Sequence, residues 1–377
     1  MTHKILAINP GSTSTKIAIY QNTKPVFLKN IKHPHEELKN FNQIVDQFQY
    51  RKEIILQELK DSHIDVTKIE TVVGRGGLVR PIQSGVYKIN EALKNDLRNG
   101  VLGEHASNLG GLIADDLAKS IPGAQALIAD PVVVDEMQIV ARVAGHPKFR
   151  RYSIFHALNH KSIARDYARL INRKYEELNL ILAHLGGGVS VGAHQHGRVI
   201  DVNQALDGNG PISPERSGTM PAGDLVDYCY SGNYTKEEIM SWISGKGGLI
   251  AYLGTNSAYE VELMVREGNE KAKIIQEAMS YQIGKEIGAM SVVLHGKADA
   301  IILTGGMSHN TMIVEYIKKM VSFIAPVVIY PGEDEMYALA MNGLRVLKGE
   351  IETKEYGEGT FVRCPLDELG ITEKQCY

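Results

Sequence analysis

The sequence predicts an α/β protein of two domains with related topology that face a shared cleft. The chain has 377 residues, more than a typical single domain holds. An apolar run, a loop of small residues and a second apolar run occupy residues 5–20, and the same order returns within residues 178–203. Elsewhere, short apolar runs typical of strands alternate with amphipathic helical patterns.

The expected elements of the first half follow from these patterns. Strands at 4–9 and 16–20, joined by the loop 10–15, form a β-hairpin. They are followed by a helix at 43–62, strands at 69–77 and 84–90, a helix at 105–121 and a strand at 124–131.

The pattern begins again near residue 150, and this renewal marks the expected domain boundary. The expected elements are a helix at 153–171, three strands within 178–203, a helix at 273–294, a strand at 298–306, a helix at 310–324, a strand at 326–332 and a helix at 333–349. The tail, residues 350–377, contains a strand pattern at 359–364 and receives no role.

Composition narrows the function. Apolar residues make up 44% and charged residues 23% of the chain, and the net charge is −3 with both signs mixed, which argues against a nucleic-acid binder. Cys229, Cys364 and Cys376 form no CxxC pair, as is typical of a reducing compartment. A strand pattern starts within a few residues of Met1, and no apolar run approaches the roughly 20 residues of a membrane span. We therefore expect a soluble, cytoplasmic protein with no nucleic-acid or membrane partner.

Three loops of small residues directly follow apolar strands, at 9–16, 186–192 and 304–310. Walker A and GxGxxG strings are absent. Glycine lets backbone N–H groups approach an anion, hydroxyls add donors, and Lys16 adds a charge. Any one of these loops also fits an ordinary turn, whereas three in this order favour phosphate binding.

Two arginines lie in constrained surroundings. Arg75 ends a strand and precedes Gly76 and Gly77, and Arg216 lies in a Pro- and Gly-rich loop of the kind that is often functional. A solvated surface role is the alternative for Arg75.

Four histidines are candidates for contacts with an anionic substrate or its phosphates. His156 and His160 lie one helical turn apart, and a packing role is favoured for His160. His184 stands between a strand and the glycine loop, where it suits phosphate contact, and His105 stands near a helix cap.

Acidic residues offer two further candidates. Asp130 ends a strand, where α/β proteins place catalytic groups, although a turn-forming role is equally economical. Glu333, Asp334 and Glu335 precede a helix, where they suit the helix dipole or a hydrated Mg²⁺ ion.

Several segments taken together resemble the butyrate kinases of the acetokinase family. They are, in chain order, "AINPGSTSTK", "GRGG", "ADPVVVDEM", "RRYSIFHALNHK", "AHLGGGVSVGAH", "SGTMPAGDL", "LTGG" and "GEDEM", and the likeness extends over roughly residues 4–349. The superfamily includes sugar kinases, actin and the ATPase domain of heat-shock chaperones.

The resemblance implies two duplicated ribonuclease H-like domains with an interdomain nucleotide cleft. The first would comprise residues 1–150, completed by a helix near 336–349, and the second, which binds the nucleotide, residues 151–335. The implied reaction is reversible phosphoryl transfer between ATP and a short-chain carboxylate, with Mg²⁺, in a homodimer or higher homo-oligomer.

The resemblance also implies roles for individual residues. Nucleotide binding is implied for Asn9, Ser12, Ser14, Lys16, His184, Gly186, Gly187, Gly188, Gly305 and Gly306. Catalysis is implied for Arg75, Asp130, His156 and Arg216, and carboxylate binding for Arg75, Gly77, His105 and Phe155. Asn9 and Glu335 are the implied Mg²⁺ ligands, with Glu333 as the alternative to Glu335. Acetate kinases place their second arginine just before a Gly-Asp pair, whereas Arg216 lies a few residues upstream of "GD".

The expected chain length of the substrate acid is inferred from Gly76 and Gly77, at positions where acetate kinases carry bulky aliphatic residues. Their missing side chains would leave room for about two more methylene groups, so we expect butyrate and expect Gly77→Val to favour acetate. Acetate, propionate and isobutyrate remain alternative acids. A nucleotide-gated binder similar to actin or a chaperone ATPase domain is disfavoured, since Asn9 stands where those proteins usually carry an acid.

Overall fold

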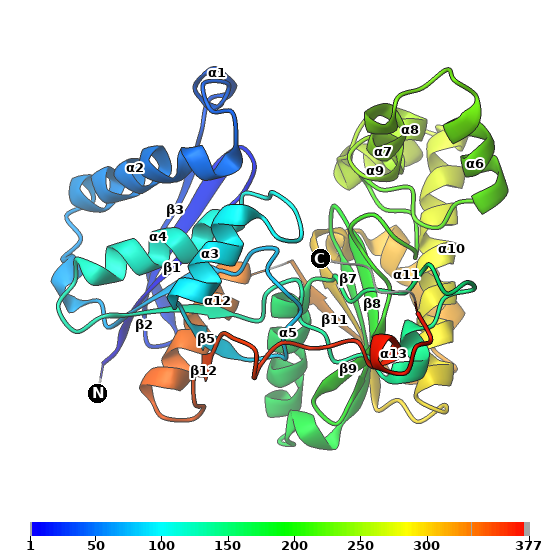
Figure 1. Cartoon of the computed structure of the whole chain (residues 1–377). Helices are drawn as coiled ribbons and strands as arrows, with labels where there is room; N and C mark the ends of the chain where they lie inside the picture. Colours follow the sequence, from blue (N-terminus) through cyan, green and yellow to red (C-terminus); the bar gives the residue numbers. More distant parts are fainter. Residues whose placement is uncertain (1, 333, 373–377) are drawn as a thin grey trace. The chain divides into compact units, whose positions relative to one another are not determined.

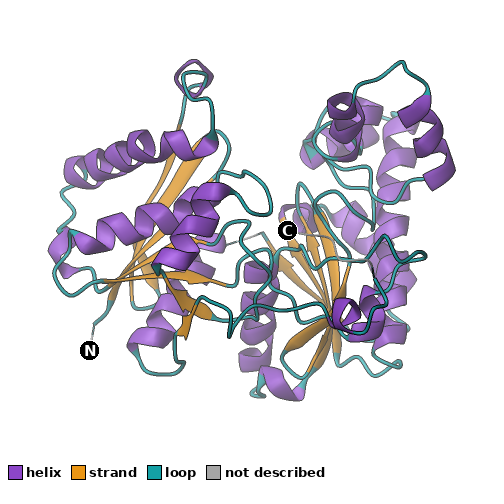
Figure 2. Cartoon of the chain, viewed as in Figure 1, coloured by secondary structure: helices purple, strands orange, loops and turns teal. Residues whose placement is uncertain are grey.

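The computed structural model describes residues 2–332 and 334–372, which form two compact units. Unit 1 holds residues 2–135 and 334–368, and unit 2 holds residues 136–332 and 369–372. Each unit combines a sheet with flanking helices (Figures 1 and 2). Among the described residues, no helix is long and apolar enough to cross a membrane.

The sheet of unit 1 has seven strands in the order β12-β5-β6-β4-β1-β2-β3. The strands are β1 (Lys4–Pro10), β2 (Ser14–Gln21), β3 (Lys24–Lys32), β4 (Thr71–Arg75), β5 (Val86–Lys88), β6 (Gln125–Ala129) and β12 (Lys354–Glu355). The pairs β1–β2 and β2–β3 are antiparallel, whereas β1–β4 and β4–β6 are parallel. The hairpin expected at the start of the chain is therefore confirmed.

The sheet of unit 2 has five strands in the order β11-β10-β7-β8-β9. They are β7 (Asn179–Leu185), β8 (Val189–Gln195), β9 (Arg198–Val202), β10 (Ala300–Gly305) and β11 (Val327–Pro331). The pairs β7–β8 and β8–β9 are antiparallel, and β7–β10 and β10–β11 are parallel. Strand for strand this repeats β1, β2, β3, β4 and β6, which confirms the predicted duplication.

The helices of unit 1 are α1 (His35–Leu38), α2 (Phe48–Asp61), α3 (Glu91–Asn99), α4 (Asn108–Lys119), α12 (Glu335–Leu347) and α13 (Pro365–Glu368). Those of unit 2 are α5 (Ala157–Leu170), α6 (Ala222–Tyr230), α7 (Lys236–Ile243), α8 (Leu249–Leu253), α9 (Ala258–Arg266), α10 (Glu270–Val293) and α11 (Thr311–Val321). Short 3₁₀ turns lie at Ile44–Gln47, Val66–Lys68, Ile139–Arg142, Tyr175–Glu177 and Gly306–His309.

Helices cover both faces of the unit 1 sheet. On β4, successive side chains point to opposite faces. Val72 belongs to the core cluster that contains Leu109 and Leu112 of α4. Val73 faces α12, where a Cβ on Gly343 would lie 2.7 Å from Val73 Cγ2. The near-continuous apolar run of β4 is thus buried on both sides, as is usual for a parallel strand.

The unit 2 sheet is covered in the same way. Leu180 and Leu182 of β7 pack in the cluster that holds Ala164 of α5. The intervening Ile181 belongs to a different cluster, formed with residues of α10 and α11 such as Ile283. Helix α5 therefore lies on one face, and α10 and α11 on the other.

Several elements of the structure were not expected from the sequence. Strand β3 is an edge strand whose residues are mostly exposed, α6 has no buried residue, and helices α3, α7, α8 and α9 were likewise not expected. The pattern at 359–364 forms only an isolated bridge, from Phe361 to Ile82, while the final strand lies earlier, at β12.

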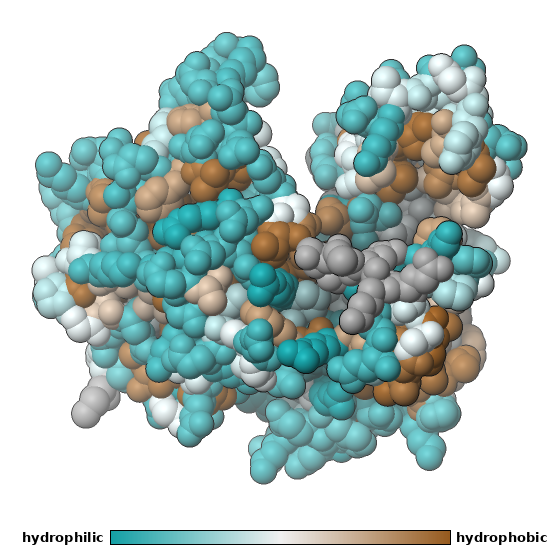
Figure 3. Space-filling model, in the orientation of Figure 1, coloured by the Kyte–Doolittle hydropathy of each residue, from teal (hydrophilic) through white to brown (hydrophobic). Residues whose placement is uncertain are grey.

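Hydrophilic side chains cover most of the surface of unit 1 in the view of Figure 3.

Helix α4 approaches β4 so closely that neither partner has room for a side chain at the contact. A Cβ on Gly110 would lie 2.4 Å from the carbonyl oxygen of Arg75, and a Cβ on Gly74 would lie 2.1 Å from that of Gly110. The contact fixes the end of β4, and with it the backbone of Arg75.

We predict that Gly110→Ala lowers the free energy of unfolding by about 2 kcal/mol, because overpacking against backbone outweighs the better helix propensity of alanine. Gly288→Ala, in the middle of α10, is the control because its added Cβ meets no atom within 4 Å. This control should raise stability by about 0.5–1 kcal/mol. Urea unfolding measures both variants, and a Gly110→Ala protein as stable as the parent would contradict the close contact.

Candidate active site

The parallel strands of unit 1 bring three predicted residues to one edge of its sheet. Asn9 is the penultimate residue of β1, Arg75 is the last of β4, and Asp130 directly follows β6. Because β1, β4 and β6 run in the same direction, their carboxyl ends lie at the same edge.

Asn9, Arg75 and Glu335 form one connected cluster. Arg75 Nη1 donates to Asn9 Oδ1 over 3.3 Å and pairs with the Glu335 carboxylate, and the Asn9 amide donates to the other oxygen of Glu335. Glu335 opens α12, and Asp334 caps that helix by accepting from the backbone N–H of Tyr337. The side chains of Arg75 and Glu335 are 20% and 17% exposed, so the ion pair is partly shielded from water. Glu333, the alternative to Glu335, lies outside the described residues.

Asp130 is buried in a strained conformation. Its φ is +37°, a region that side-chain-bearing residues rarely adopt and that costs about 1–3 kcal/mol. Its Oδ1 accepts from Ser84 Oγ over 2.6 Å and from the N–H of Gly85 over 2.9 Å. These bonds fix the orientation of the carboxylate at the sheet edge.

The first glycine loop forms a tight connection between β1 and β2. The N–H of Gly11 donates to the carbonyl of Ser14 over 2.7 Å, and Ser12 is exposed. Lys16 is exposed on β2 and makes no ion pair with any described residue. Its ammonium is therefore available to an external anion.

The physical argument for a spacious acid pocket at Gly76 and Gly77 is wrong. Both glycines are buried: a Cβ on Gly77 would lie 2.3 Å from Asn108 Oδ1, and one on Gly76 would lie 2.6 Å from Pro131 Cβ. Asn108 is held there because its Oδ1 accepts from the N–H of Leu78 over 2.9 Å. The space is filled by the protein, so Gly77→Val would displace Asn108 and is not a test of acid size.

His105 lies before α4 and is exposed. Its Nδ1 lies 2.8 Å from Ser107 Oγ and accepts from the Ser107 N–H over 3.2 Å. The expected position near a helix start is confirmed, while its contact with a carboxylate stays a prediction.

In unit 2, the Pro- and Gly-rich loop lies directly against the GGG loop. The carbonyl of Gly187 accepts from Ser213 Oγ over 2.8 Å and from the N–H of Glu215 over 3.3 Å. A Cβ on Gly188 would lie 1.6 Å from Arg216 Nη1, so the guanidinium rests on the bare backbone of Gly188. Burial lowers the pKa of Arg216, with Glu215 acting in the opposite direction. Its Nε has no hydrogen-bond partner among the described residues.

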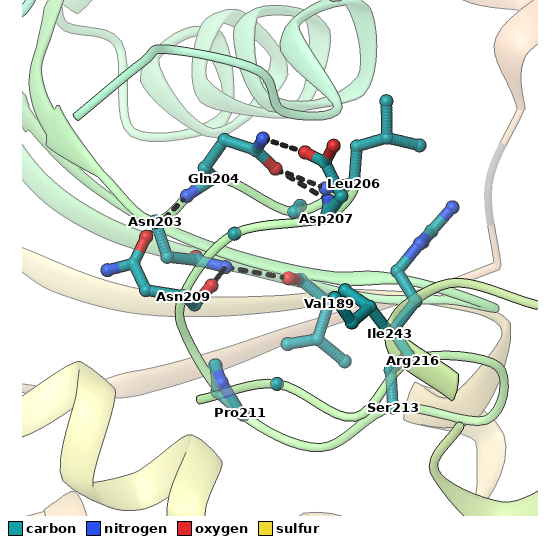
Figure 4. Close-up of a pocket in the computed structure, with 13 residues that line it drawn as sticks. Val189, Asn203, Gln204, Leu206, Asp207, Asn209, Pro211, Ser213, Arg216 and Ile243 are labelled. Atoms are coloured by element: carbon teal, nitrogen blue, oxygen red, sulfur yellow. Dashed lines mark hydrogen bonds between the residues drawn. The ribbon is translucent and has the colours of Figure 1, made fainter. Parts of the chain in front are cut away.

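The segment after β9 lines a pocket beside Arg216 and is held by its own side chains (Figure 4). The Asn203 amide donates to the carbonyls of Val189 and Asn209 over 3.1 and 3.2 Å, and Gln204 Oε1 accepts from the N–H groups of Leu206 and Asp207. The segment that lines this pocket is therefore hydrogen-bonded to Val189, the first residue of β8.

The second and third glycine loops line one pocket of about 480 Å³ in unit 2. Its lining includes Gly186 and Gly187 on one side and Gly306, His309 and Asn310 on another. Because β7 and β10 are parallel, the loops that follow them meet at the same sheet edge.

Gly305 and Asn310 shape the third loop. Gly305 has a φ of +91°, and a Cβ on it would lie 2.4 Å from the carbonyl oxygen of Leu185. Asn310 caps α11 by accepting from the N–H groups of Met312 and Ile313, which confirms the expected helix start.

His156 and His184 stack face to face, with ring centroids 3.9 Å apart and planes 17° from parallel. His184 is 1% exposed, and its Nδ1 lies 2.9 Å from Asn159 Oδ1, whereas His156 is the partly exposed N-cap residue of α5. Phe155 is buried and packs edge-on against His160, with centroids 5.1 Å apart.

A buried chain of hydrogen bonds supports His156 from behind. His156 Nδ1 and His160 Nε2 each lie 2.9 Å from Ser190 Oγ. His160 Nδ1 lies 3.1 Å from His194 Nε2, and His194 Nδ1 lies 2.7 Å from the hydroxyl of Tyr175. His160, for which the sequence favoured a packing role, is buried and also connects Ser190 to His194 by hydrogen bonds.

An alternating pattern in the sequence is a signal for this chain of hydrogen bonds. Ser190, Gly192 and His194 alternate along β8 and therefore lie on one face of the sheet, where Gly192 leaves room for the His160 ring. Burial lowers the pKa values of both His160 and His194 well below the ordinary value, so both are neutral.

With these two rings neutral, one arrangement of protons has each group donate to the next, from Tyr175 through His194, His160 and Ser190 to His156 Nδ1. This arrangement places the proton of a neutral His156 on Nε2. In the reverse arrangement His156 Nδ1 donates and the Tyr175 oxygen accepts. Because a hydroxyl oxygen can accept two hydrogen bonds, Ser190 can also accept from both His156 and His160. Ser190 is therefore the group that links the tautomer of His156 to the buried rings.

Comparison with known proteins identifies the family. The acetokinase family matches residues 136–325. Butyrate kinase 2 of Clostridium acetobutylicum is 54% identical over 356 residues, which cover 94% of this chain and 100% of that protein. The chain belongs to the acetokinase family.

Solved structures share the fold of this acetokinase. The acetate kinase of Porphyromonas gingivalis has a TM-score of 0.73 at 20% identity, covering 92% of this chain and 100% of that chain. A propionate kinase from Francisella tularensis subsp. tularensis has a TM-score of 0.70 at 18% identity, covering 90% and 98%.

The neutral histidines predict an acid-sensitive stability for this acetokinase. Below pH 6.5 these histidines are protonated in the unfolded protein but stay neutral in the folded protein. The free energy of unfolding therefore falls as the pH drops from 6.5 towards the lowered pKa of the folded state. The groups that hold His194 neutral are its buried surroundings and Lys161.

We predict that His194→Gln, which cannot titrate, reduces the slope of unfolding free energy against pH between 6.5 and 5.5 by up to about 1.4 kcal/mol per pH unit. Urea unfolding at half-unit steps of pH measures the slope. Equal slopes in parent and variant would contradict the prediction, because they would mean that His194 has the same pKa in the folded and unfolded protein.

Proposed function

We propose that this acetokinase is a butyrate kinase, which reversibly transfers the γ-phosphoryl group of ATP to butyrate and forms butyryl phosphate and ADP. The observation that carries the proposal is the 54% identity to Butyrate kinase 2, which spans 94% of this chain and the whole of that protein. The side chains gathered at the two sheet edges suit the same chemistry.

The proposed step is a direct in-line displacement. A carboxylate oxygen of butyrate forms a bond to the γ-phosphorus, the bond from that phosphorus to the β–γ bridging oxygen breaks, and ADP leaves. Because the acid is already ionised at neutral pH, no general base is required. The protein has to position two anions and offset their charge.

Arginines and a histidine fit that requirement. Arg75 would bind the carboxylate and the transferring phosphoryl group, and Arg216 would contact the phosphoryl group from the Gly188 side. His156, whose Nδ1 is bound to Ser190, would direct Nε2–H at a phosphoryl or carboxylate oxygen. Asp130 would orient neighbouring cationic groups from its fixed position.

The nucleotide would bind to the small-residue loops. Backbone N–H groups of Gly186, Gly187 and Gly188 would contact the β- and γ-phosphates, together with Ser12, Ser14, Lys16 and His184. Gly305 and Gly306 would line the adenosine site, since the second and third loops share one pocket in unit 2.

Asn9 and Glu335 carry the kind of oxygen ligands that Mg²⁺ prefers. Mg²⁺ is usually held by one or two protein oxygens together with phosphate oxygens and water. The carboxylate of Glu335 accepts from the Asn9 amide nitrogen, and the Asn9 amide oxygen, which accepts from Arg75, lies on the same small side chain. When bound, the ion would neutralise phosphate charge. Arg75 pairs with Glu335, so it would lie beside the same phosphates.

The acid preference is tested with hydroxylamine, which traps acyl phosphates as hydroxamates. ATP, Mg²⁺ and straight or branched acids from C2 to C5 are supplied in parallel, and we expect the largest yield with butyrate. A maximum at acetate, propionate or isobutyrate would replace butyrate while keeping the kinase, because one methylene discriminates by only about 1–3 kcal/mol. No hydroxamate from any acid would overturn the proposed activity.

We predict that Arg75→Lys reduces kcat at least about 10³-fold while circular dichroism and unfolding stay near those of the parent, because lysine cannot bridge two oxygens with a planar fork. Arg80→Lys is the matched control, since Arg80 is exposed and lies outside the cluster. Near-parental activity in Arg75→Lys would remove Arg75 from catalysis.

We predict that Glu335→Gln raises the Mg²⁺ concentration for half-maximal activity by about tenfold or more, since a neutral amide is a weaker ligand than a carboxylate. Glu333→Gln is measured alongside. A shift confined to Glu333→Gln would move the metal role to that residue.

A further inference from the structure

We propose that Arg51 is a positioning residue for phosphoryl transfer: its buried guanidinium holds the β1–β2 loop so that two backbone N–H groups of that loop face a bound phosphate. The proposal rests on the proposed kinase function and assigns a role to a residue far from the loop in sequence. Arg51 lies on α2, near the start of the helix.

Every polar contact of Arg51 is directed at the loop or at the residue one turn earlier in the helix. Nη1 donates to the carbonyls of Gly11 and Ser14 over 2.7 and 3.2 Å and to Thr15 Oγ1 over 3.1 Å. Nη2 donates to the carbonyl of Ser12 over 3.0 Å, and both Nε and Nη2 donate to Gln47 Oε1. The guanidinium therefore binds three backbone carbonyls of the loop at once.

These contacts determine where the loop's N–H groups point. In a trans peptide the C=O and the following N–H point in opposite directions. Since the carbonyls of Gly11 and Ser12 turn towards Arg51, the N–H groups of Ser12 and Thr13 turn away from it. Neither N–H has an acceptor among the described residues, and both residues are exposed. Two adjacent outward N–H groups form the kind of concavity that binds an anion.

The charge of Arg51 is buried without a counter-ion. Arg51 is 1% exposed, and no carboxylate of the described residues lies within ion-pair distance of it. Burial lowers its pKa to about 10, so it remains protonated at neutral pH. Burying an unpaired charge is costly unless other groups compensate, and all of its acceptors are neutral. An anion on the outer side of the loop would supply the missing negative charge.

A second layer fixes the acceptor at Thr15. Thr15 Oγ1 accepts from Arg51 and lies 2.8 Å from His33 Nε2, so the two groups share a second hydrogen bond. Burial, together with Arg51, lowers the pKa of His33 to about 4, which keeps the ring neutral and able to accept. Lys16, the next residue of β2, points to the opposite face and stays exposed.

The alternative is that Arg51 only anchors α2 to the hairpin. Ile55, one turn further along α2, is 0% exposed and belongs to the hydrophobic core, and its alkyl side chain cannot hydrogen-bond to the loop carbonyls. Ile55→Ala therefore weakens the anchoring of α2 and leaves the loop contacts in place. It is the matched control for a general loss of stability.

The experiment compares the parent with Arg51→Met, Arg51→Lys and Ile55→Ala by two readouts. The first is kcat and KM for ATP in the hydroxamate assay, below the melting temperature of every variant. We expect kcat/KM for ATP to fall at least about 100-fold in Arg51→Met and less in Arg51→Lys, and to change less than about threefold in Ile55→Ala despite a comparable loss of Tm. An equal activity loss in Ile55→Ala, or none in Arg51→Met, would overturn the positioning role.

The second readout is hydrogen exchange of the peptide covering residues 11–15 with and without MgATP, which does not depend on acyl transfer. We expect MgATP to slow exchange in the parent and in Ile55→Ala but not in Arg51→Met. Slowing in all four proteins, or in none, would contradict the proposal. An inactive parent that still shows the expected pattern would reject the kinase function alone.

Discussion

Parallel pairing of the central strands is the constraint on which the candidate site depends. When β1, β4 and β6 run in one direction, the residues at their carboxyl ends must share an edge, whatever their separation in sequence. Asn9 and Arg75 are brought into hydrogen-bond contact in this way. The same pairing of β7 with β10 places the second and third glycine loops around one pocket.

The close contact of α4 with β4 makes that edge rigid. Gly74 and Gly110 allow backbone to meet backbone, and Gly76 and Gly77 continue the tight packing against Pro131 and Asn108. A phosphoryl-transfer site needs cations fixed before the reaction begins, since reorganisation during the reaction adds to the barrier. The packing of the glycines after β4 fixes the backbone next to Arg75 and leaves no open space beside Gly77.

The sequence was most informative where a function depends on local composition. Loops of small residues, the hairpin at the start of the chain, the arginine at a strand end and the acidic residues before the last long helix are visible without knowledge of the fold, and the resemblance to the family selected Glu335 among those acids. Arg51 and His194 could not be found in that way. Arg51 contacts Gly11 and His194 contacts His160, and each pair is distant in sequence and meets only when helix and strand pack. The argument from Gly77 failed because a missing side chain implies empty space only if no neighbour fills it, and Asn108 does.

The duplicated sheets also show how one topology can be adapted to two tasks. Both units place a loop of small residues between their first two strands, but the support behind each loop differs. Behind the loop of unit 1 lies the charge of Arg51, which donates to the carbonyls of Gly11 and Ser12. The GGG loop of unit 2 also has a guanidinium against it, because Arg216 rests directly on the backbone of Gly188. The buried rings of His160 and His194, held uncharged by burial, lie further along β8, behind Ser190. A buried cation attracts an anion over a long range, while neutral rings fix the direction of a hydrogen bond without adding charge. Both units therefore place a guanidinium against the loop of small residues, and unit 2 adds a neutral chain that orients His156.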